Sequence, residues 1–177
     1  KADLEKAAEG VARAAFGYGG QKCSACSRVY VHNSIKIRFA EKLIEKTRSL
    51  KIGNPLLKDT FLGPLINKDA YEKFQRSVQE AGAEGRIIAG GNIVLEGDYR
   101  HGYYVEPTII DDALKDSRLF KEELFVPILA IAGFDTLDEA IKLVNDVDYG
   151  LTAGIFSEDV EEQNKFFDKV QAGVLYV

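Results

Sequence analysis

The later two-thirds of the chain alternates short apolar runs, typical of buried strands, with amphipathic runs, typical of helices. The runs predicted as strands are 86–89, 103–110, 128–132, 151–156 and 174–177. The runs predicted as helices are 67–81, 136–145 and 159–170. Gly82 is expected to end the first of these helices, and Thr136 and Glu139 form a capping box at the start of the second. This alternation predicts an α/β domain with a largely parallel sheet.

The first third of the chain has a different pattern. A helix is predicted over residues 2–16, and the glycine-rich segment 17–20 ends it. A short strand is expected over 29–31, after which Ser34 is expected to cap another helix. Residues 51–66 hold two of the four prolines and are predicted to form an extended loop. The residues best suited to chemistry lie in the turn between the first helix and the first strand.

Charge and hydropathy disfavour several classes of partner. The 177 residues carry a formal net charge of −5 with no basic block, which argues against nucleic acid or an anionic membrane as the main partner. No apolar run approaches the roughly 18 residues that cross a bilayer, and no signal peptide opens the chain. We therefore expect a single cytoplasmic domain without a membrane partner.

Both ends of the sequence suggest a piece of a larger protein. The chain has no Met, begins with Lys1, and stops inside a strand-like run, residues 173–177. A complete chain of this length usually holds several methionines. We expect one domain of a longer protein, and the alternative is a complete small protein that ends in a strand.

Cys23 is the first candidate for chemistry. It lies between Lys22 and Arg28, two cations of the kind that lower a thiol pKa and favour the nucleophilic thiolate. Gly19 and Gly20 let the backbone approach a substrate and aim N–H groups at a developing oxyanion. Residue type alone leaves a plainer interpretation open, in which the cysteines are small buried core residues.

Cys23 and Cys26 also form a C-x-x-C pair, which fits a redox pair or half of a zinc site. Zinc would need His32 and His101 as further ligands, yet neither lies at the short spacing usual for such sites. Neither histidine has a catalytic partner in the sequence, so we expect surface or turn roles for both. A non-catalytic domain with a structural or metal-binding C-x-x-C stays open as an alternative, although we predict no metal site.

A second unusual segment, F-K-E-E-L-F-V-P at residues 120–127, precedes the strongest predicted strand. Paired glutamates are usually solvated, but a glutamate at this place is also suited to bind a ribose diol. The chain has no Walker A pattern, and the glycines of 17–20 do not make a dinucleotide-binding fingerprint because they follow a helix. Composition alone does not decide the role of these glutamates.

Four motifs together resemble the aldehyde dehydrogenase family. G-G-Q-K-C-S-A-C-S-R at 19–28 resembles the family's catalytic cysteine motif, and E-P-T at 106–108 resembles the entry to one of its strands. K-E-E-L-F-V-P at 121–127 resembles its E-E-I-F-G-P motif, and Y-G-L-T-A-G-I-F at 149–156 resembles its Y-G-L strand. All four come in the family's order. The resemblance implies a three-layer α/β catalytic domain of the family's type over residues 1–177.

The cysteine motif is similar to that of 1-pyrroline-5-carboxylate dehydrogenases, which oxidise glutamate γ-semialdehyde to glutamate in proline degradation. The resemblance implies that the Cys23 thiolate attacks the aldehyde carbon and forms a hemithioacetal, whose oxyanion the backbone N–H of Cys23 helps to hold. Hydride transfer to NAD then leaves a thioester, which water hydrolyses. Another semialdehyde dehydrogenase, for example of the succinate-semialdehyde type, is the alternative within the family.

The same resemblance assigns roles to further residues. Glu123 matches the position that binds the nicotinamide ribose, and Phe125 matches the residue that flanks this ribose. Ser24 matches a position that helps to hold the substrate carboxylate. Val126 stands where the family motif has Gly, and we expect this difference to alter the backbone beside the cofactor.

The family uses NAD or NADP, acts on small aldehydes and forms homo-oligomers. The resemblance places the nucleotide-binding domain, the glutamate base and the oligomerisation strand outside residues 1–177. We therefore expect the isolated chain to carry the nucleophile yet to lack turnover, and the full-length protein to be a homo-oligomer.

Overall fold

The computed structural model describes residues 1–177. The α-helices are α1 (Leu4–Phe16), α2 (Lys36–Arg48), α3 (Lys68–Glu84), α4 (Arg118–Lys121), α5 (Leu137–Asn145) and α6 (Val160–Lys169). The strands are β1 (Arg28–His32), β2 (Arg86–Ala89), β3 (Thr108–Asp111), β4 (Ile128–Phe134), β5 (Thr152–Gly154) and β6 (Val174–Tyr176). Short 3₁₀ turns are η1 (Gly17–Gly20), η2 (Asn33–Ile35) and η3 (Gly97–His101).

Four strands form the main sheet in the order β1-β4-β3-β2. Strand β4 runs parallel to both of its neighbours, β1 and β3, whereas β2 pairs antiparallel with β3 at the edge. Strands β5 and β6 form a separate parallel pair. The largely parallel sheet predicted from the alternating pattern is therefore confirmed.

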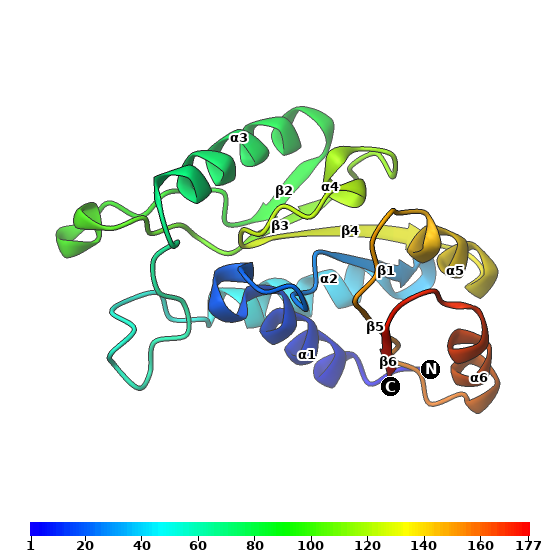
Figure 1. Ribbon diagram of the computed structural model, residues 1–177. Coiled ribbons are helices and arrows are strands. Elements are labelled where there is room, and N and C mark those ends of the chain that lie inside the picture. Colours follow the sequence, from blue (N-terminus) through cyan, green and yellow to red (C-terminus); the bar gives the residue numbers. More distant parts are fainter.

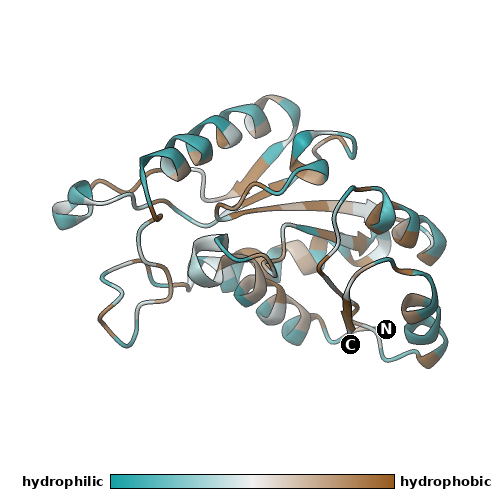
Figure 2. Ribbon diagram, in the orientation of Figure 1, coloured by the Kyte–Doolittle hydropathy of each residue, from teal (hydrophilic) through white to brown (hydrophobic).

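Helices cover both faces of this sheet (Figure 1), which makes the expected three layers. In β4, Leu129 and Ile131 pack with α1 and α2, while Ile128 and Ala130 pack with α3 and α4. A central strand buried on both faces is typical of parallel sheets. Figure 2 shows hydrophobic residues along the strands and hydrophilic residues on the outer side of α3. No helix in the chain has the length and hydropathy to span a bilayer.

Helix α1 fixes the start of the cysteine-containing turn. Asp3 caps the helix, since its carboxylate accepts hydrogen bonds from the N–H groups of Glu5 and Lys6. Small buried residues such as Ala8 and Ala12 form its inner face and let α2 pack closely against it. The rigid helix therefore delivers the chain to η1 at a defined position.

Ser34 does not cap α2, so that prediction is wrong. Ser34 lies in η2, and its N–H donates to Nδ1 of His32 at 3.2 Å. Ile35 precedes the helix and makes no side-chain cap. The intervening 3₁₀ turn accepts the N–H of Lys36, the first residue of α2, at the carbonyl oxygen of Asn33.

Gly82 does not end α3, which continues to Glu84 and stops at Gly85. A Cβ at Gly85 would lie 2.9 Å from backbone atoms of Ala113, so this close approach requires glycine. At Gly82 no such contact exists, and glycine there only lowers helix propensity.

The strand predicted over 103–110 is mostly a loop. Only Thr108–Asp111 forms a strand, and the earlier part makes one isolated bridge, between Ile93 and Val105. Pro107 interrupts the run because it offers no N–H to a ladder. Helix α4, a single turn, was not predicted.

Candidate active site

Two loops lead into the neighbouring parallel strands β1 and β4, and the loops meet at the amino ends of these strands. The cysteine loop, residues 17–27, leads into β1, and the acidic loop, residues 121–127, leads into β4. Because β1 and β4 are parallel neighbours, their amino ends lie side by side. Cys23, Glu123 and Phe125 accordingly line one hollow.

The hollow is small, about 30 Å³, and mainly apolar. Its remaining lining includes Ala15, Gly20, Lys22, Cys26, Val126 and Tyr149. The sequence predicted four site residues, and three of them meet here. Ser24 is exposed beside Cys23 and does not line the hollow.

A left-handed backbone turn brings the cysteine loop against the acidic loop. Tyr18, Gly19 and Gly20 have φ angles of 55°, 64° and 68°. A Cβ at Gly20 would lie 2.6 Å from the carbonyl oxygen of Val126. Position 20 therefore requires glycine for its conformation and for the close approach.

The two cysteines differ in exposure. Cys23 is exposed, whereas the Cys26 thiol is turned inward and donates to the carbonyl oxygen of Arg28 at 3.5 Å. Burial raises the pKa of Cys26 to about 11. Cys26 is half-buried against the core with its thiol directed inward, whereas the interpretation as a buried thiol is wrong for Cys23.

The backbone around Cys23 leaves a donor free. The N–H of Ala25 donates to Lys22 at 3.0 Å, and the N–H of Cys26 donates to Ala14 at 3.2 Å. The N–H groups of Cys23 and Ser24 donate to no acceptor in the chain. A free backbone donor next to an exposed thiol is what an oxyanion formed at that thiol requires.

The two expected cations take different positions. A Cβ built at Gly17 would lie 3.3 Å from the Lys22 ammonium, so Lys22 reaches back towards the end of α1. The Arg28 guanidinium donates to the carbonyl oxygens of Phe120 and Val144, at 3.2 and 3.3 Å. Arg28 therefore bonds to backbone carbonyls and is not a free cation beside Cys23.

The acidic loop presents Glu123 and Phe125 to solvent. Glu123 is exposed and makes no hydrogen bond or ion pair within the chain. The Phe125 side chain is 40% exposed, and its φ of 60° is in the left-handed region that favours glycine. Val126 is buried with an ordinary φ, so the unusual backbone lies one residue before the position where the motif differs.

Tyr149 is a site residue that the analysis of the sequence missed. Its ring lines the hollow and lies 5.5 Å from the Arg28 guanidinium. Its hydroxyl is buried without a hydrogen-bond partner. The sequence feature that could have identified Tyr149 as a site residue is its position at the start of the Y-G-L motif.

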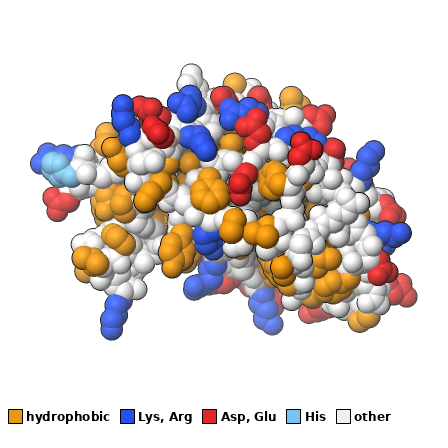
Figure 3. Space-filling view, in the orientation of Figure 1, with side chains coloured by type: hydrophobic (Ala, Val, Ile, Leu, Met, Phe, Trp, Pro, Cys, Tyr) orange, Lys and Arg blue, Asp and Glu red, His pale blue; other side chains and the backbone are white.

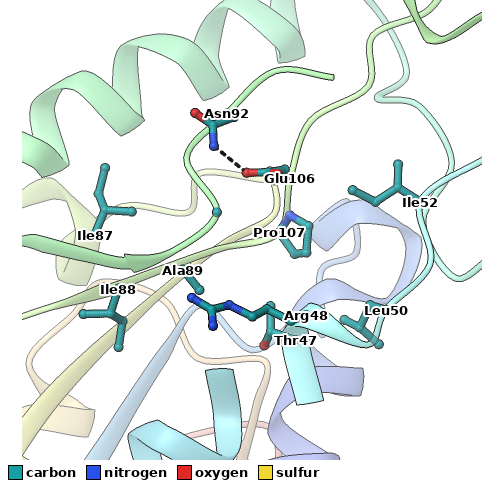
Figure 4. A pocket seen from close by; sticks show the side chains of 11 residues that line it. Thr47, Arg48, Leu50, Ile52, Ile87, Ile88, Ala89, Asn92, Glu106 and Pro107 are labelled. Carbon is teal, nitrogen blue, oxygen red and sulfur yellow. Dashed lines mark hydrogen bonds between the residues drawn. The ribbon is translucent and has the colours of Figure 1, made fainter. Parts of the chain in front are cut away.

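A larger hollow of about 440 Å³ lies elsewhere, between the end of α2 and strand β2 (Figure 4). Asn92 donates to Glu106 across it at 2.8 Å, and Arg48 extends towards β2. It contains no thiol, no imidazole and none of the predicted site residues. The smaller hollow is therefore the better candidate for chemistry.

The histidines lie outside both hollows. His32 bonds to Ser34, and His101 lies in η3 beside Arg100. No three His, Cys, Asp or Glu side chains lie close enough together to hold a metal ion. The zinc interpretation of the C-x-x-C pair therefore finds no ligand cluster.

Comparison with known proteins identifies close relatives of the chain. The family model described as "Aldehyde dehydrogenase family" matches residues 1–177. An α-ketoglutaric semialdehyde dehydrogenase of Bacillus subtilis (strain 168) is 38% identical over 177 residues, which are 99% of this chain and 36% of the relative. A 1-pyrroline-5-carboxylate dehydrogenase of Staphylococcus haemolyticus (strain JCSC1435) is 39% identical over 175 residues, 99% of this chain and 33% of the relative.

Solved structures agree with this result. A 1-pyrroline-5-carboxylate dehydrogenase from Thermus with bound NAD superimposes with a TM-score of 0.93 at 31% identity, covering 99% of this chain and 33% of that one. A Staphylococcus aureus betaine aldehyde dehydrogenase in complex with NAD⁺ gives 0.95 at 36% identity, covering 99% and 35%. The chain thus spans about a third of the length of these relatives. The motifs, the fold and these matches show that the chain belongs to the aldehyde dehydrogenase family.

Proposed function

We propose that the chain is the nucleophile-bearing domain of an NAD(P)-dependent dehydrogenase that oxidises glutamate γ-semialdehyde to glutamate. One observation carries the proposal: Cys23 is exposed in the same hollow as Glu123 and Phe125, while Cys26 is half-buried and its thiol is turned inward with a raised pKa. The site offers one accessible thiol, a free backbone N–H and a separate polar and aromatic surface. These are the groups that thiol-based oxidation of an aldehyde needs.

In this mechanism the Cys23 sulfur forms a bond to the aldehyde carbon, and the carbonyl oxygen becomes an oxyanion. The N–H of Cys23, which has no acceptor within the chain, is assigned as a donor to that oxygen. Loss of a hydride from the carbon leaves a thioester on Cys23. Water then cleaves the carbon–sulfur bond, which releases the carboxylic acid and restores the thiol.

The residues of the acidic loop fit a nicotinamide nucleotide. The Glu123 carboxylate is unpaired and suited to accept hydrogen bonds from a ribose diol, and the exposed Phe125 ring offers an apolar surface beside it. When bound, NAD or NADP supplies the acceptor for the hydride. The NAD complexes of the Thermus and Staphylococcus aureus relatives support this choice.

The choice of substrate depends on the cysteine motif and on the relatives. Relatives named 1-pyrroline-5-carboxylate dehydrogenase support glutamate γ-semialdehyde. The cysteine motif assigns Ser24, which is exposed beside Cys23, as a contact for the substrate carboxylate. A second candidate is α-ketoglutaric semialdehyde, because a relative of that name is 38% identical over the whole chain. Both substrates are semialdehydes with a terminal carboxylate.

The full-length protein is proposed to be a cytoplasmic homo-oligomer, and residues 1–177 alone are proposed to lack turnover. Exposed apolar side chains in β6 and directly after it, Val174, Tyr176 and Val177, support contacts of this region with further protein. Figure 3 shows hydrophobic side chains gathered over β5 and β6.

The test is NADH and NADPH formation by the full-length protein with a panel of aldehydes. We expect the highest kcat/KM for glutamate γ-semialdehyde, its loss in Cys23→Ala, and retention of activity in Cys26→Ala. A preference for α-ketoglutaric semialdehyde would select the second candidate. Full activity of Cys23→Ala would contradict both.

A further inference from the structure

We propose that Arg28 is a positioning residue that holds the acidic loop in register with the cysteine loop. The inference depends on the proposed function, because it assigns Arg28 a role in aligning Glu123 and Phe125 with Cys23. Arg28 does not line the hollow, so it acts through the backbone and not on the reacting atoms.

The side chain of Arg28 bonds to two helices, α4, which precedes the acidic loop, and α5, which follows β4. Nη1 donates to the carbonyl oxygen of Phe120 in α4, and Nη2 donates to that of Val144 in α5. Both carbonyls lie in the last turn of their helix, where acceptors lack intrahelical partners and a cation is favourable. The guanidinium therefore joins the ends of α4 and α5.

The Phe120 carbonyl is an effective anchor for the acidic loop. Phe120 is fully buried and its ring stacks on Tyr30 of β1, with ring centroids 5.8 Å apart. Glu123 follows only three residues later. A bond at Phe120 therefore restrains the start of the loop that presents Glu123.

The backbone of Arg28, the first residue of β1, directly follows the cysteine loop and bonds to it. Its carbonyl oxygen accepts the Cys26 thiol proton, and the preceding carbonyl, of Ser27, accepts the N–H of Ala130 in β4. One residue thus binds the cysteine loop through its backbone and the acidic loop through its side chain.

The other polar contacts of the acidic loop come from different elements. Lys73 of α3 donates to the carbonyl oxygen of Leu124 at 3.0 Å, Lys121 donates to Asp146 after α5, and Glu122 pairs with Arg118 of α4. None of these contacts involves the cysteine loop. Arg28 provides the hydrogen bond that links the cysteine-loop segment to α4.

Tyr149 adds a third contact that favours arginine over lysine. The guanidinium carbon lies 5.5 Å from the centre of the Tyr149 ring, which lines the hollow. A planar guanidinium can donate to two carbonyls and still lie over a ring, whereas an ammonium has no such plane. We therefore expect lysine to replace Arg28 only in part.

The experiment compares Arg28→Met, Arg28→Lys and Arg118→Met in the full-length protein. Arg118 lies on α4 and pairs with Glu122 of the acidic loop and with Glu80, but both pairs are exposed and neither reaches the cysteine loop. The first measurement is hydrogen–deuterium exchange over residues 20–26 and 121–126. It needs no substrate or cofactor and so tests the link itself.

We expect Arg28→Met to speed exchange in both segments about tenfold, because it removes two charge-assisted hydrogen bonds. Arg28→Lys should give an intermediate increase, and Arg118→Met less than about threefold. The KM for NAD should rise about tenfold in Arg28→Met, with a smaller change in kcat.

Unchanged exchange over 121–126 in Arg28→Met would overturn the inference. If Arg28→Met does not fold, the exchange of Arg28→Lys is the deciding measurement. Exchange in Arg28→Lys that is no faster than in the wild type, in either segment, would overturn the inference. If exchange rises while the wild-type protein oxidises no aldehyde, the link between the loops is supported and the proposed function fails. If exchange rises but the KM for NAD does not, the link has no positioning role and the inference fails.

Discussion

At the scale of single residues, the site depends on backbone conformations that side chains rarely adopt. Phe125 has a φ of 60° and Gly20 a φ of 68°, and the two residues line the same hollow. For a residue with a Cβ, this conformation costs roughly 1–2 kcal/mol. At Gly20 that cost is avoided, whereas at Phe125 it accompanies an exposed aromatic ring suited to bind a ligand.

Replacing Phe125 separates the ring from the backbone conformation. We expect Phe125→Gly to be more stable than Phe125→Ala, with a free energy of unfolding about 1 kcal/mol higher, because glycine adopts a positive φ without strain. Both variants should show a raised KM for NAD, since both lack the ring. The measurements are urea unfolding and steady-state kinetics on the full-length protein. A less stable glycine variant would show that the φ value stores no strain.

Replacing Gly20 tests the contact between the two loops. In Gly20→Ala the new Cβ meets the Val126 carbonyl oxygen at 2.6 Å. We expect a loss of at least about 2 kcal/mol of stability, from strain and overpacking together. Gly97→Ala is a matched control, because Gly97 also has a positive φ but no atom near its Cβ. Equal losses in the two variants would attribute the whole effect to φ and none to the contact.

At the scale of helices and strands, parallel pairing places the site. The cysteine loop enters β1 and the acidic loop enters β4, and these strands are adjacent in the sheet. Ligand sites in open α/β sheets usually lie at the carboxyl ends of strands. Here the candidate site lies at the amino ends, because both functional loops precede their strands.

Much of this arrangement could be predicted from the sequence. The strands at 86–89 and 128–132 and the helix starting after Asn67 follow from hydrophobic period and capping residues, and the structure has them. The pairing of β1 with β4, which brings Cys23 to Glu123, depends on strand order. No local pattern encodes strand order, so only the resemblance to a family indicated that these two residues meet.

The errors have physical causes of the same kind. Ser34 has the residue type of a helix cap, but its N–H donates to His32 and it lies within a 3₁₀ turn that precedes the helix. Arg28 looks like a cation for Cys23, but two helix-end carbonyls and a tyrosine ring hold it. In both cases a tertiary neighbour decides the role of a residue that local sequence describes only by type.

A cluster of ion pairs at the carboxyl end of β3 joins this strand to α2 and β2. Lys36, at the start of α2, pairs with Asp111 at 2.6 Å and with Asp112 at 2.8 Å, and Arg86 of β2 pairs with both carboxylates. The Asp111 side chain is only 8% exposed. Hydrogen bonding to Lys36 lowers the pKa of Asp112.

Removing Lys36 should therefore destabilise the domain. We expect Lys36→Met to cost about 2 kcal/mol or more, because it leaves the buried Asp111 carboxylate with Arg86 as its remaining ion-pair partner. Lys165→Met is the control, since Lys165 forms an exposed pair with Asp138 and should change stability by less than about 0.5 kcal/mol.

The difference in free energy of unfolding between the wild type and Lys36→Met should depend on pH, and its sign follows from the pKa of Asp112. A carboxyl whose folded-state pKa is lowered contributes stability above its unfolded pKa of about 3.9, and that stability is lost as pH falls through the folded pKa. The gap between wild type and Lys36→Met should therefore be full at pH 7 and shrink below about pH 4. Thermal unfolding from pH 3 to 7 measures it. A gap that widens in acid would contradict the role of the Asp112 carboxylate.

At the scale of the whole molecule, we expect the proposed nucleophile to lie in residues 1–177, whereas turnover needs more of the protein. The chain spans about a third of the length of its relatives, yet it contains Cys23, its backbone donor and the acidic loop. We expect the isolated chain to react with iodoacetamide at Cys23 and to form no NADH with aldehyde and NAD. NADH formation above a Cys23→Ala control would show that these residues suffice for turnover.

The difference between the two cysteines is the central claim, and alkylation against pH tests it most directly. The full-length protein is treated with limiting iodoacetamide from pH 6 to 10, and adducts are mapped by mass spectrometry. We predict labelling of Cys23 in step with loss of dehydrogenase activity. Cys26 should stay unlabelled at neutral pH, because burial holds its pKa near 11. Labelling of Cys26 first, or full activity after complete labelling of Cys23, would contradict the account.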